Sequence, residues 1–348
     1  MSRFYDITLA NAAGQVYQFT ADGNGFTLGT GGTTFSSLTN GINNPGALNI
    51  EFDIPVSNYN TPQGNSHITV WGVGLGMIGQ AAQLAGASIT VSGGMKPGLP
   101  LATAAASQAG ILIQGTVYQS YGNWQGNAQT LDLVINSGIA ALDQNISFNW
   151  IAGQTLASAI AATLSQAFPA PTFKQSINIG SLFLPSTEPG LYSNFWQFAS
   201  YINDISQRYG KPIYGPNYAG VNLMVVGNTI FAYDGTVPVT PKQLAFQDMI
   251  GQPTWINQGV VSFKTVMRSD FALGTQFTFP QGVQSPYAVT TPASAVPNGL
   301  AGQKSIFQGR FLINDVHHFA NFRQPDADAW VTAFRAYPVD NFGIALPT

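Results

Sequence analysis

Residues 68–91 read ITVWGVGLGMIGQAAQLAGASITV, and this stretch decides between two folds for the chain. Gly74, Gly76 and Gly79 form the pattern G-x-G-x-x-G, which follows a predicted strand, opens a short predicted helix and leads into a second strand. In dinucleotide-binding folds, this pattern places a pyrophosphate at the N-terminus of a helix. The stretch therefore raises the hypothesis of a cofactor-binding enzyme.

The surroundings of these glycines argue against a cofactor. A dinucleotide site needs an acidic side chain about 20 residues further on to bind the ribose hydroxyls. Here the next strand ends at Ser92, and the next acid is Asp132. The predicted helix, residues 76–85, is short and ends before Gly86, and no series of βαβ units follows. We therefore expect no cofactor. The glycines predict a strand-to-helix corner that packs closely against another backbone.

The composition suggests that other proteins cover much of this chain. Only 8% of its 348 residues are charged, against about 25% in ordinary soluble domains, and a monomer with so few charges tends to associate. The alternative is an exterior rich in Asn, Gln, Ser and Thr. The net charge of −3 provides no basic surface for nucleic acid or anionic lipid, and no apolar run reaches the length of about 18 residues that spans a membrane. We expect no nucleic-acid sequence recognition and no membrane insertion.

The residue types also limit the chemistry. The chain has no Cys, which excludes disulfides, thiolate catalysis and cysteine-bound metals. The Ser, Thr and Lys residues form no nucleophile signature such as G-x-S-x-G. Glu occurs only at Glu51 and Glu188, and Glu51 lies opposite the apolar face of its strand, which favours a solvent or interface position. We therefore expect no enzymatic activity. The N-terminus, MSRFYDITLA, lacks the pattern of a secretory signal, so we expect assembly in a cytoplasm.

Adjacent histidines followed by an Asp-x-Asp turn are the other candidate for chemistry. On a strand, His317 and His318 point to opposite faces and do not share a metal ion. Asp326 and Asp328 follow Pro325 in a predicted turn, where Asp side chains commonly bond to the backbone. Structural histidines and a capped turn are therefore favoured over a metal site.

Residues 1–143 predict an N-terminal β-barrel. Short runs rich in β-branched and aromatic residues are bounded by Gly, Asn or Pro, and residues 47–56 (ALNIEFDIPV) alternate strictly between apolar and other side chains. This pattern is typical of a barrel or sandwich, here with one small helix at residues 76–85. Residues 122–130 (GNWQGNAQT) are predicted as a polar hairpin loop between the last two strands.

Residues 144–236 predict a small α/β domain of two helices and a hairpin. The first helix covers residues 153–168, where large apolar residues recur every four positions on one face. The hairpin covers residues 221–235 and turns at Gly227-Asn228, a pair that favours turns.

The second helix of this domain is predicted over residues 194–210. Its apolar stripe includes Phe195, Phe198 and Ile202, which recur with helical spacing. Gly210 follows the stripe and is predicted to end the helix, because glycine commonly lies just beyond a helix C-terminus.

Residues 237–348 predict a C-terminal β-barrel, with strands that include residues 242–251 and 259–267. Residues 280–303 contain several Pro and little periodicity, so they are predicted as a long loop, a type that is often functional. The fold class predicted for the whole chain is mainly β with an α+β insertion: two β-barrels that flank a small α/β domain.

Several phrases of the sequence, taken together and in order, resemble the baseplate hub proteins of phage tails. They lie at residues 44–56, 68–102 and 109–135 in the first domain, at 146–169, 198–214 and 228–238 in the second, and at 244–280 and 309–338 in the third. Examples are NPGALNIEFDIPV, FASYINDISQRYGKPIY and GRFLINDVHHFANFRQPDADAWVTAFRAYP. The resemblance spans nearly the whole chain.

This resemblance implies a fold and an assembly. Both barrels would be tail-tube-like, and the chain would form a homotrimer in the virion, at the distal end of the tail tube. Six similar barrels would then match the sixfold tube, and the threefold axis would match the central spike. The implied partners are further copies of the chain, the tail tube protein, the central spike protein and baseplate wedge or tape-measure proteins. The implied role is structural, in a tail that ejects the viral genome, and the family has no catalytic residues to transfer.

The candidate interface residues follow from their positions in this frame. They are Gly74, Gly76, Gly79, Trp124 and Trp255. The polar loop at 122–130 and the long loop at 280–303 are further candidate contact elements.

Two other functions remain open from the sequence. One is a carbohydrate-binding or carbohydrate-degrading tail β-protein, in which Tyr121, Trp124, Trp255 and Trp330 stack on sugars. The other is a different tube-like tail ring protein, although such a ring subunit needs only one barrel and an attachment arm.

Overall fold

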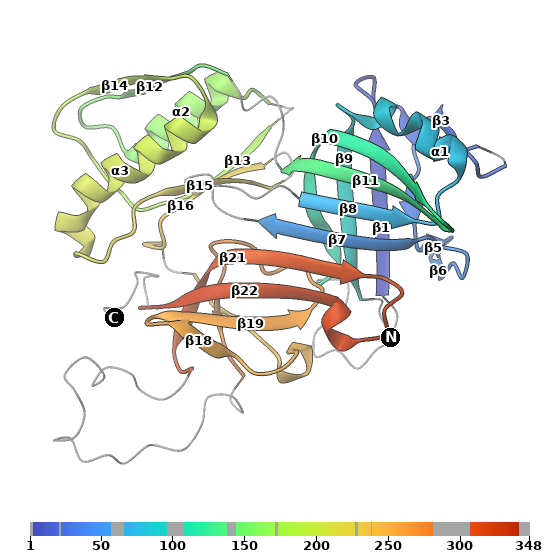
Figure 1. Ribbon diagram of the computed structural model, residues 1–348. Coiled ribbons are helices and arrows are strands. Elements are labelled where there is room, and N and C mark those ends of the chain that lie inside the picture. Colours follow the sequence, from blue (N-terminus) through green and yellow to red (C-terminus); the bar gives the residue numbers. More distant parts are fainter. Residues whose placement is uncertain are drawn as a thin grey trace, which may run out of the picture.

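The computed structural model describes residues 3–20, 22–56, 66–95, 108–137, 144–170, 173–226, 229–237, 239–280 and 307–340. Three parts lie beside one another (Figure 1). We refer to residues 3–137 as the N-terminal half, to 144–237 as the α/β unit, and to 239–340 as the C-terminal half. In the view of Figure 1, the α/β unit lies at the upper left, the N-terminal half at the right and the C-terminal half below.

Within the described residues, 15 strands form one mostly antiparallel sheet that runs through both halves. Its main path has the order β18-β19-β22-β21-β7-β8-β11-β10-β9-β1-β2-β3, and β4, β17 and β20 attach beside this path. The halves meet where β7 (Asn49–Val56) pairs with β21 (Arg310–Asn321). This seam joins strands more than 250 positions apart, since Val316 pairs with Val56. Both ends of the chain therefore build one sheet.

The remaining strands of this sheet follow in chain order. They are β1 (Arg3–Ala10), β2 (Val16–Phe19), β3 (Phe26–Gly29), β4 (Phe35–Ser36), β8 (Ser66–Trp71), β9 (Ser88–Met95), β10 (Gly110–Gln125), β11 (Ala128–Ser137), β17 (Lys242–Gln243), β18 (Thr254–Asn257), β19 (Val260–Val266), β20 (Gln276–Thr278) and β22 (Trp330–Val339). A separate short pair, β5 (Leu38–Thr39) and β6 (Ile42–Asn43), lies before β7.

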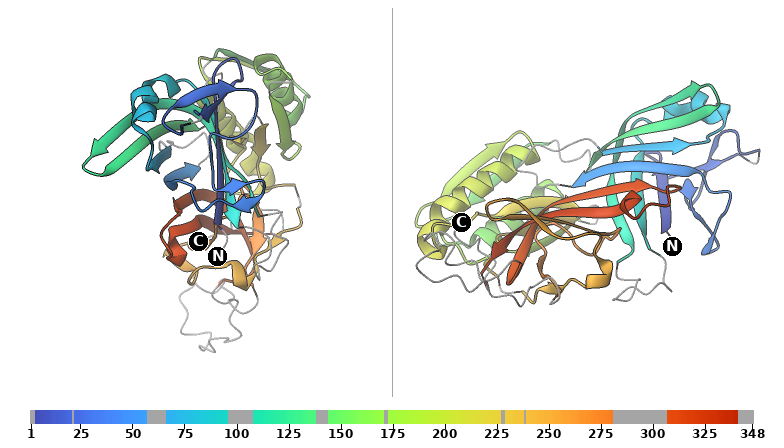
Figure 2. Two further views of the ribbon diagram at one scale, coloured as in Figure 1. Left: turned by 90° about the vertical axis from the view of Figure 1, so that its right-hand side faces the viewer. Right: turned by 60° about the horizontal axis from the view of Figure 1, so that its bottom comes forward.

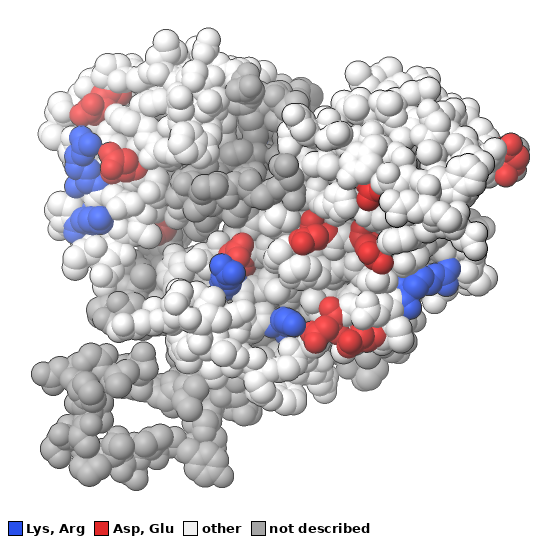
Figure 3. Space-filling model, viewed as in Figure 1, with Lys and Arg blue, Asp and Glu red and all other residues white. Residues whose placement is uncertain are grey.

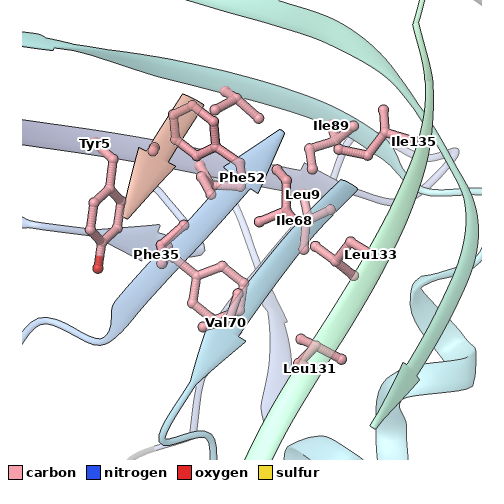
Figure 4. Packing of buried hydrophobic residues seen from close by; sticks show 14 of the residues in the cluster. Tyr5, Leu9, Phe35, Phe52, Ile68, Val70, Ile89, Leu131, Leu133 and Ile135 are labelled. Carbon is pink, nitrogen blue, oxygen red and sulfur yellow. The ribbon is translucent and has the colours of Figure 1, made fainter. Parts of the chain in front are cut away.

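The core of the N-terminal half follows from the alternation in its strands. In β1, every second side chain is buried, and β7, β8 and β11 direct Phe52, Ile68 and Leu133 into the same interior. Figure 4 shows these side chains converging between the curved strands. Each such side chain contributes about 1.5–3 kcal/mol when it is removed from water. Helix α1 (Leu75–Gln80) and the 3₁₀ helix η1 (Ala81–Leu84) pack against this core, which confirms the helix predicted at residues 76–85.

In its described residues, the α/β unit contains two α-helices and two small sheets around its own core. Its elements are β12 (Ile146–Trp150), α2 (Leu156–Ala167), β13 (Lys174–Asn178), β14 (Glu188–Tyr192), α3 (Phe195–Tyr214), β15 (Asn222–Val226) and β16 (Thr229–Tyr233). Helix α2 confirms the first predicted helix, and the antiparallel pair β15–β16 confirms the strands of the predicted hairpin. The predicted turn residues, Gly227 and Asn228, lie outside the described residues.

The predicted end of α3 at Gly210 is wrong. The helix continues through Pro212 to Tyr214, and Gly215, with a φ of 101°, ends it by donating its N–H to the Lys211 carbonyl at 3.0 Å. Gly210 is buried in the last turns, where a Cβ would lie 2.6 Å from Cδ1 of Tyr218. The glycine therefore makes room for an aromatic ring.

Two predictions in the β-rich halves are also corrected. Residues 122–130 are mostly strand, because β10 runs to Gln125 and β11 begins at Ala128, with a turn at Gly126 and Asn127. Residues 242–251 are not one strand: two residues form β17, and the 3₁₀ helix η4 (Phe246–Asp248) follows. This bend places the Asp248 carboxylate beside Arg268 in the interior. The predicted loop at 280–303 lies almost entirely outside the described residues.

The predicted fold class is confirmed: the chain is mainly β with an inserted α/β unit. The buried side chains that the structure describes form three clusters, one centred in each part. The first cluster also contains Met267, Ala320 and Trp330 from the C-terminal half. Closure of each half as a separate barrel, and the domain limits at 143/144 and 236/237, stay predictions.

Candidate interface surface

The glycine corner packs against a turn of the same chain. Gly74 is the N-cap of α1, and a Cβ there would lie 2.9 Å from the Cα of Asn24. A Cβ on Gly76 would overlap the Asn24 carbonyl oxygen, and the Gly76 N–H donates to Oδ1 of Asn24 at 3.1 Å. The backbone approach expected from these glycines therefore involves the turn between β2 and β3. Asn24 binds the amide that would face a pyrophosphate in a dinucleotide site.

The third glycine differs from the first two. In the described part of the chain, no atom lies within 4 Å of the position that a Cβ on Gly79 would take, so this side of α1 is open. An open depression of about 520 Å³ lies at the corner and is lined by Thr20, Asp22, Asn24, Gly25, Gly76 and Gln80. The Thr20 hydroxyl and then the Asn24 amide lower the pKa of the fully exposed Asp22 carboxyl. The corner therefore carries one exposed carboxylate beside an open depression.

Among the described residues of the N-terminal half, the most exposed aromatic side chains lie on the hairpin β10–β11. Figure 2 shows it projecting past the neighbouring strands. Tyr118 is 66% exposed and Trp124 is 63% exposed, and Tyr121 lies between them. The indole N–H of Trp124 donates to the Gly126 carbonyl at 2.9 Å, so the ring presents an apolar surface without an unsatisfied donor. From Gly110 to Leu131 the sequence has no charged residue.

The glycine corner and the hairpin lie side by side. Gly122 of β10 packs against Ile78 of α1, where a Cβ would lie 2.9 Å from the Ile78 Cα. The Ser120 hydroxyl donates to the Ala81 carbonyl at 2.6 Å. The structure thus brings Trp124 and the three predicted glycines to one end of the N-terminal half. In Figure 3 this region, at the upper right, is largely free of charged side chains.

Trp255 lies apart from this end. It belongs to β18 of the C-terminal half, where its half-buried ring stacks on Phe307 with centroids 5.6 Å apart and an interplanar angle of 11°. The interface role predicted for Trp255, as for the three glycines and Trp124, stays a prediction.

The aromatic residues considered for a sugar cleft do not line one cleft. Tyr121 and Trp124 are three positions apart on β10 and point to opposite faces of the hairpin. Trp330 is buried in the interior, and Trp255 packs within the other half.

A network of polar and charged side chains lies on the outer face of the sheet, near the seam. This network was not predicted from the sequence. Asp132 of β11 is nearly buried, and its carboxylate accepts hydrogen bonds from Thr69 at 2.7 Å and from Asn123 at 3.0 Å. His67 lies 3.5 Å from the same carboxylate. In the sequence, Asp132 looks like any other acidic residue of an alternating strand. The network becomes visible only when β11 is paired with β8, which places Asp132 opposite Thr69.

The adjacent histidines have separate environments, as their strand positions predicted. His317 points outward and contacts Asp53 of β7. His318 is buried, and its Nδ1 lies 3.0 Å from the Thr332 hydroxyl. Burial lowers the pKa of His318 to about 3, with a smaller effect from His317. The predicted Asp turn is also confirmed, because Asp326 caps a 3₁₀ turn and accepts from the Asp328 N–H.

Metal-ligating clusters and membrane-spanning helices are absent from the described residues. These residues contain no group of three or more His, Cys, Asp or Glu side chains arranged to hold a metal ion. None of the helices they form is both long and apolar enough to span a membrane.

No protein-family model and no curated protein sequence matches the chain. Similar solved structures include the tail protein from Neisseria meningitidis MC58 (TM-score 0.42, 11% identity, covering 84% of this chain and 96% of that one). The 43 kDa tail protein of prophage MuSo2 from Shewanella oneidensis aligns with TM-score 0.47 and 9% identity over 99% of both chains. A chain of the half-lidded Francisella PdpA–VgrG complex aligns with TM-score 0.49 and 8% identity over 99% of this chain and 59% of that one. These likenesses concern the fold and not the function.

Proposed function

We propose that the chain is a structural component of a phage tail: a baseplate hub that forms a homotrimer and joins the tail tube to the central spike. The observation that carries the proposal is the hairpin β10–β11, which has no charged residue from Gly110 to Leu131 and exposes Tyr118, Tyr121 and Trp124. Exposed aromatic side chains on a segment without charged residues are typical of protein interfaces.

The sequence resemblance to baseplate hub proteins supports the same proposal, because it covers all three parts of the chain in order. The continuous sheet supports it physically. Since β7 pairs with the second half of β21, residues 316–321, one sheet joins the two halves. In this role the chain acts through its contacts and not through catalysis.

The proposal predicts the mass and symmetry of the assembly. Light scattering of the purified chain should give three times the protomer mass of 36.9 kDa. Electron microscopy with the tail tube and spike proteins should place a threefold ring between them. A chain that stays monomeric even in the presence of both partners would overturn the proposal.

A pair of variants locates the contact. Trp124→Ser on the hairpin should weaken binding to the tube protein or to further copies. Leu191→Ser is the matched control, because Leu191 is an exposed apolar side chain on β14 of the α/β unit, away from the hairpin. Equal effects of the two changes would show that the hairpin has no special part in assembly.

A further inference from the structure

Residues 321–330, the turn between β21 and β22 with one strand residue at each end, belong to the C-terminal half but pack against the N-terminal half. The middle of the turn is exposed, whereas Trp330 at its end is buried. Trp330 is only 2% exposed, and its ring packs edge-on against Phe52 at 5.6 Å and Phe322 at 5.8 Å. Its indole N–H donates to the Gly94 carbonyl at 3.1 Å. Trp330 is therefore part of the core that the first 135 residues build.

Two arginines, one from each half, hold this turn in place, because each donates hydrogen bonds to the other half. Arg3 of β1 donates to the carbonyl of Asn321 at 3.2 Å, and also to the carbonyls of Gln324 and Asp326. In the opposite direction, Arg323 of the turn donates to the Pro45 carbonyl at 3.0 Å and to the Ala47 carbonyl. Each guanidinium thus satisfies backbone carbonyls of the other half. In a chain with 8% charged residues, two of the few arginines serve this joint.

Backbone contacts extend the joint. The Phe322 N–H donates to the Ile50 carbonyl at 2.9 Å, and the Arg323 N–H donates to Oδ1 of Asn49 at 3.0 Å. The ring of Tyr5 meets that of Phe322 edge-on, with centroids 4.9 Å apart. The bonds from Arg323 to Asn49 and Pro45 lie at the surface, where water can replace them, whereas the bond from Trp330 to Gly94 is buried. Removal of the turn would therefore open the core mainly at Trp330 and leave the Gly94 carbonyl without a partner.

The partners of the turn are far away in sequence. Trp330 and Gly94 are 236 positions apart, and Arg3 and Gln324 are 321 apart. Contacts of such separation form only after a large loop closes. The N-terminal half, although its residues come first, cannot complete its core from local contacts alone.

We propose that residues 321–330 act as a closing plug: the N-terminal half completes its core, and presents its assembly surface, only when the end of the chain has folded onto it. The two halves then fold and unfold as one cooperative unit. As a result, incomplete chains are excluded from assembly. The folding part of this proposal does not depend on the hub function, whereas the part about assembly rests on the proposed function.

The test is pulsed hydrogen exchange during refolding of the full chain, read by mass spectrometry. Peptides from β1 and β9 should gain protection in the same kinetic phase as peptides from β22. The α/β unit, with its separate core, is the internal reference. Protection of β1 and β9 in an earlier phase than β22 would overturn the plug.

Variants distinguish the contribution of the two arginines from a general loss of stability. Arg3→Gln combined with Arg323→Gln should lower the protection of β1 and β9 at equilibrium by at least about tenfold and leave the α/β unit unchanged. Arg335→Gln is the matched control, because Arg335 is an exposed arginine of β22 that faces Asp315 of its own half. If the double variant does not fold, Trp330→Phe keeps an aromatic ring but removes the bond to Gly94 and part of the buried ring volume. Unchanged protection of β1 and β9 in both variants would contradict the proposal.

Discussion

At the scale of single residues, the three glycines of the corner have different physical roles. Gly76 faces the Asn24 carbonyl, so Gly76→Ala forces two backbones apart and should destabilise the fold by about 1–3 kcal/mol. Gly79 lies in α1 and faces open space in the described structure, so Gly79→Ala should stabilise the helix by about 0.5–1 kcal/mol. Urea unfolding measures both changes. Effects of the same sign would show that the packing at Asn24 is not decisive.

His318 predicts how stability depends on pH. Its pKa in the folded chain, about 3, lies below the ordinary value of 6.5. The unfolded chain therefore binds more protons between these values, so the free energy of unfolding falls as the pH decreases from about 6.5 towards 3. Each pH unit in this window costs up to about 1.4 kcal/mol.

The measurement is urea unfolding at about pH 7 and about pH 5. His318→Phe removes the buried titrating group and should reduce the loss of stability on acidification. His67→Gln changes a half-exposed histidine and is the control. A wild-type chain and a His318→Phe variant with equal acid dependence would contradict this assignment.

At the scale of elements, the sequence predicted the start of α3 better than its end. The start of α3 has a local signal, because Asn194 caps the helix by accepting from the Gln197 N–H at 2.9 Å, and the Gln197 side chain accepts in return from the Ser193 N–H. Its end has no such signal. Gly210 reads as a stop, but its role depends on Tyr218, which the fold brings back from the following turn.

The cap of α3 predicts a measurable cost. Asn194→Ala removes the acceptor for the Gln197 N–H and should reduce the free energy of unfolding by about 1 kcal/mol. Asn194→Ser keeps a capping oxygen and should recover most of this loss. Circular dichroism during urea unfolding compares the two variants, and equal stability of Asn194→Ala and the wild type would refute the contribution of the cap.

At the scale of the whole molecule, the sequence predicted three parts and a mainly β fold, but it did not predict how the halves join. The alternation in residues 47–56 shows that β7 has one buried face, and it contains no information on which strand lies beside it. The partner, β21, follows more than 250 residues later. The same reason explains the missed network around Asp132 and the missed position of Trp330: each depends on pairing between distant segments.

A second joint between the halves lies at the start of β10 and depends on one buried arginine. Arg268 is 2% exposed and lies 3.1 Å from Asp248 and 2.6 Å from Asp270. Asp248 also accepts a hydrogen bond from the side-chain amide of Gln108. The main-chain carbonyl of Gln108 accepts from the Ser269 N–H at 2.8 Å. Arg268 therefore neutralises the Asp248 carboxylate, to which Gln108 of the N-terminal half is hydrogen-bonded.

Arg268→Met should be strongly destabilising, because it leaves the Asp248 carboxylate, 1% exposed, without a counter-charge. Removal of one partner of a buried ion pair costs about 3–5 kcal/mol, whereas an exposed pair contributes about 0–1 kcal/mol. Lys264→Gln, which removes the exposed Lys264–Asp328 pair in the same half, is the matched control. Because the penalty arises from the unpaired charge, adding Asp248→Asn to Arg268→Met should recover part of the loss in urea unfolding. Full additivity of the two losses would show instead that Arg268 stabilises the joint through packing and not through its charge.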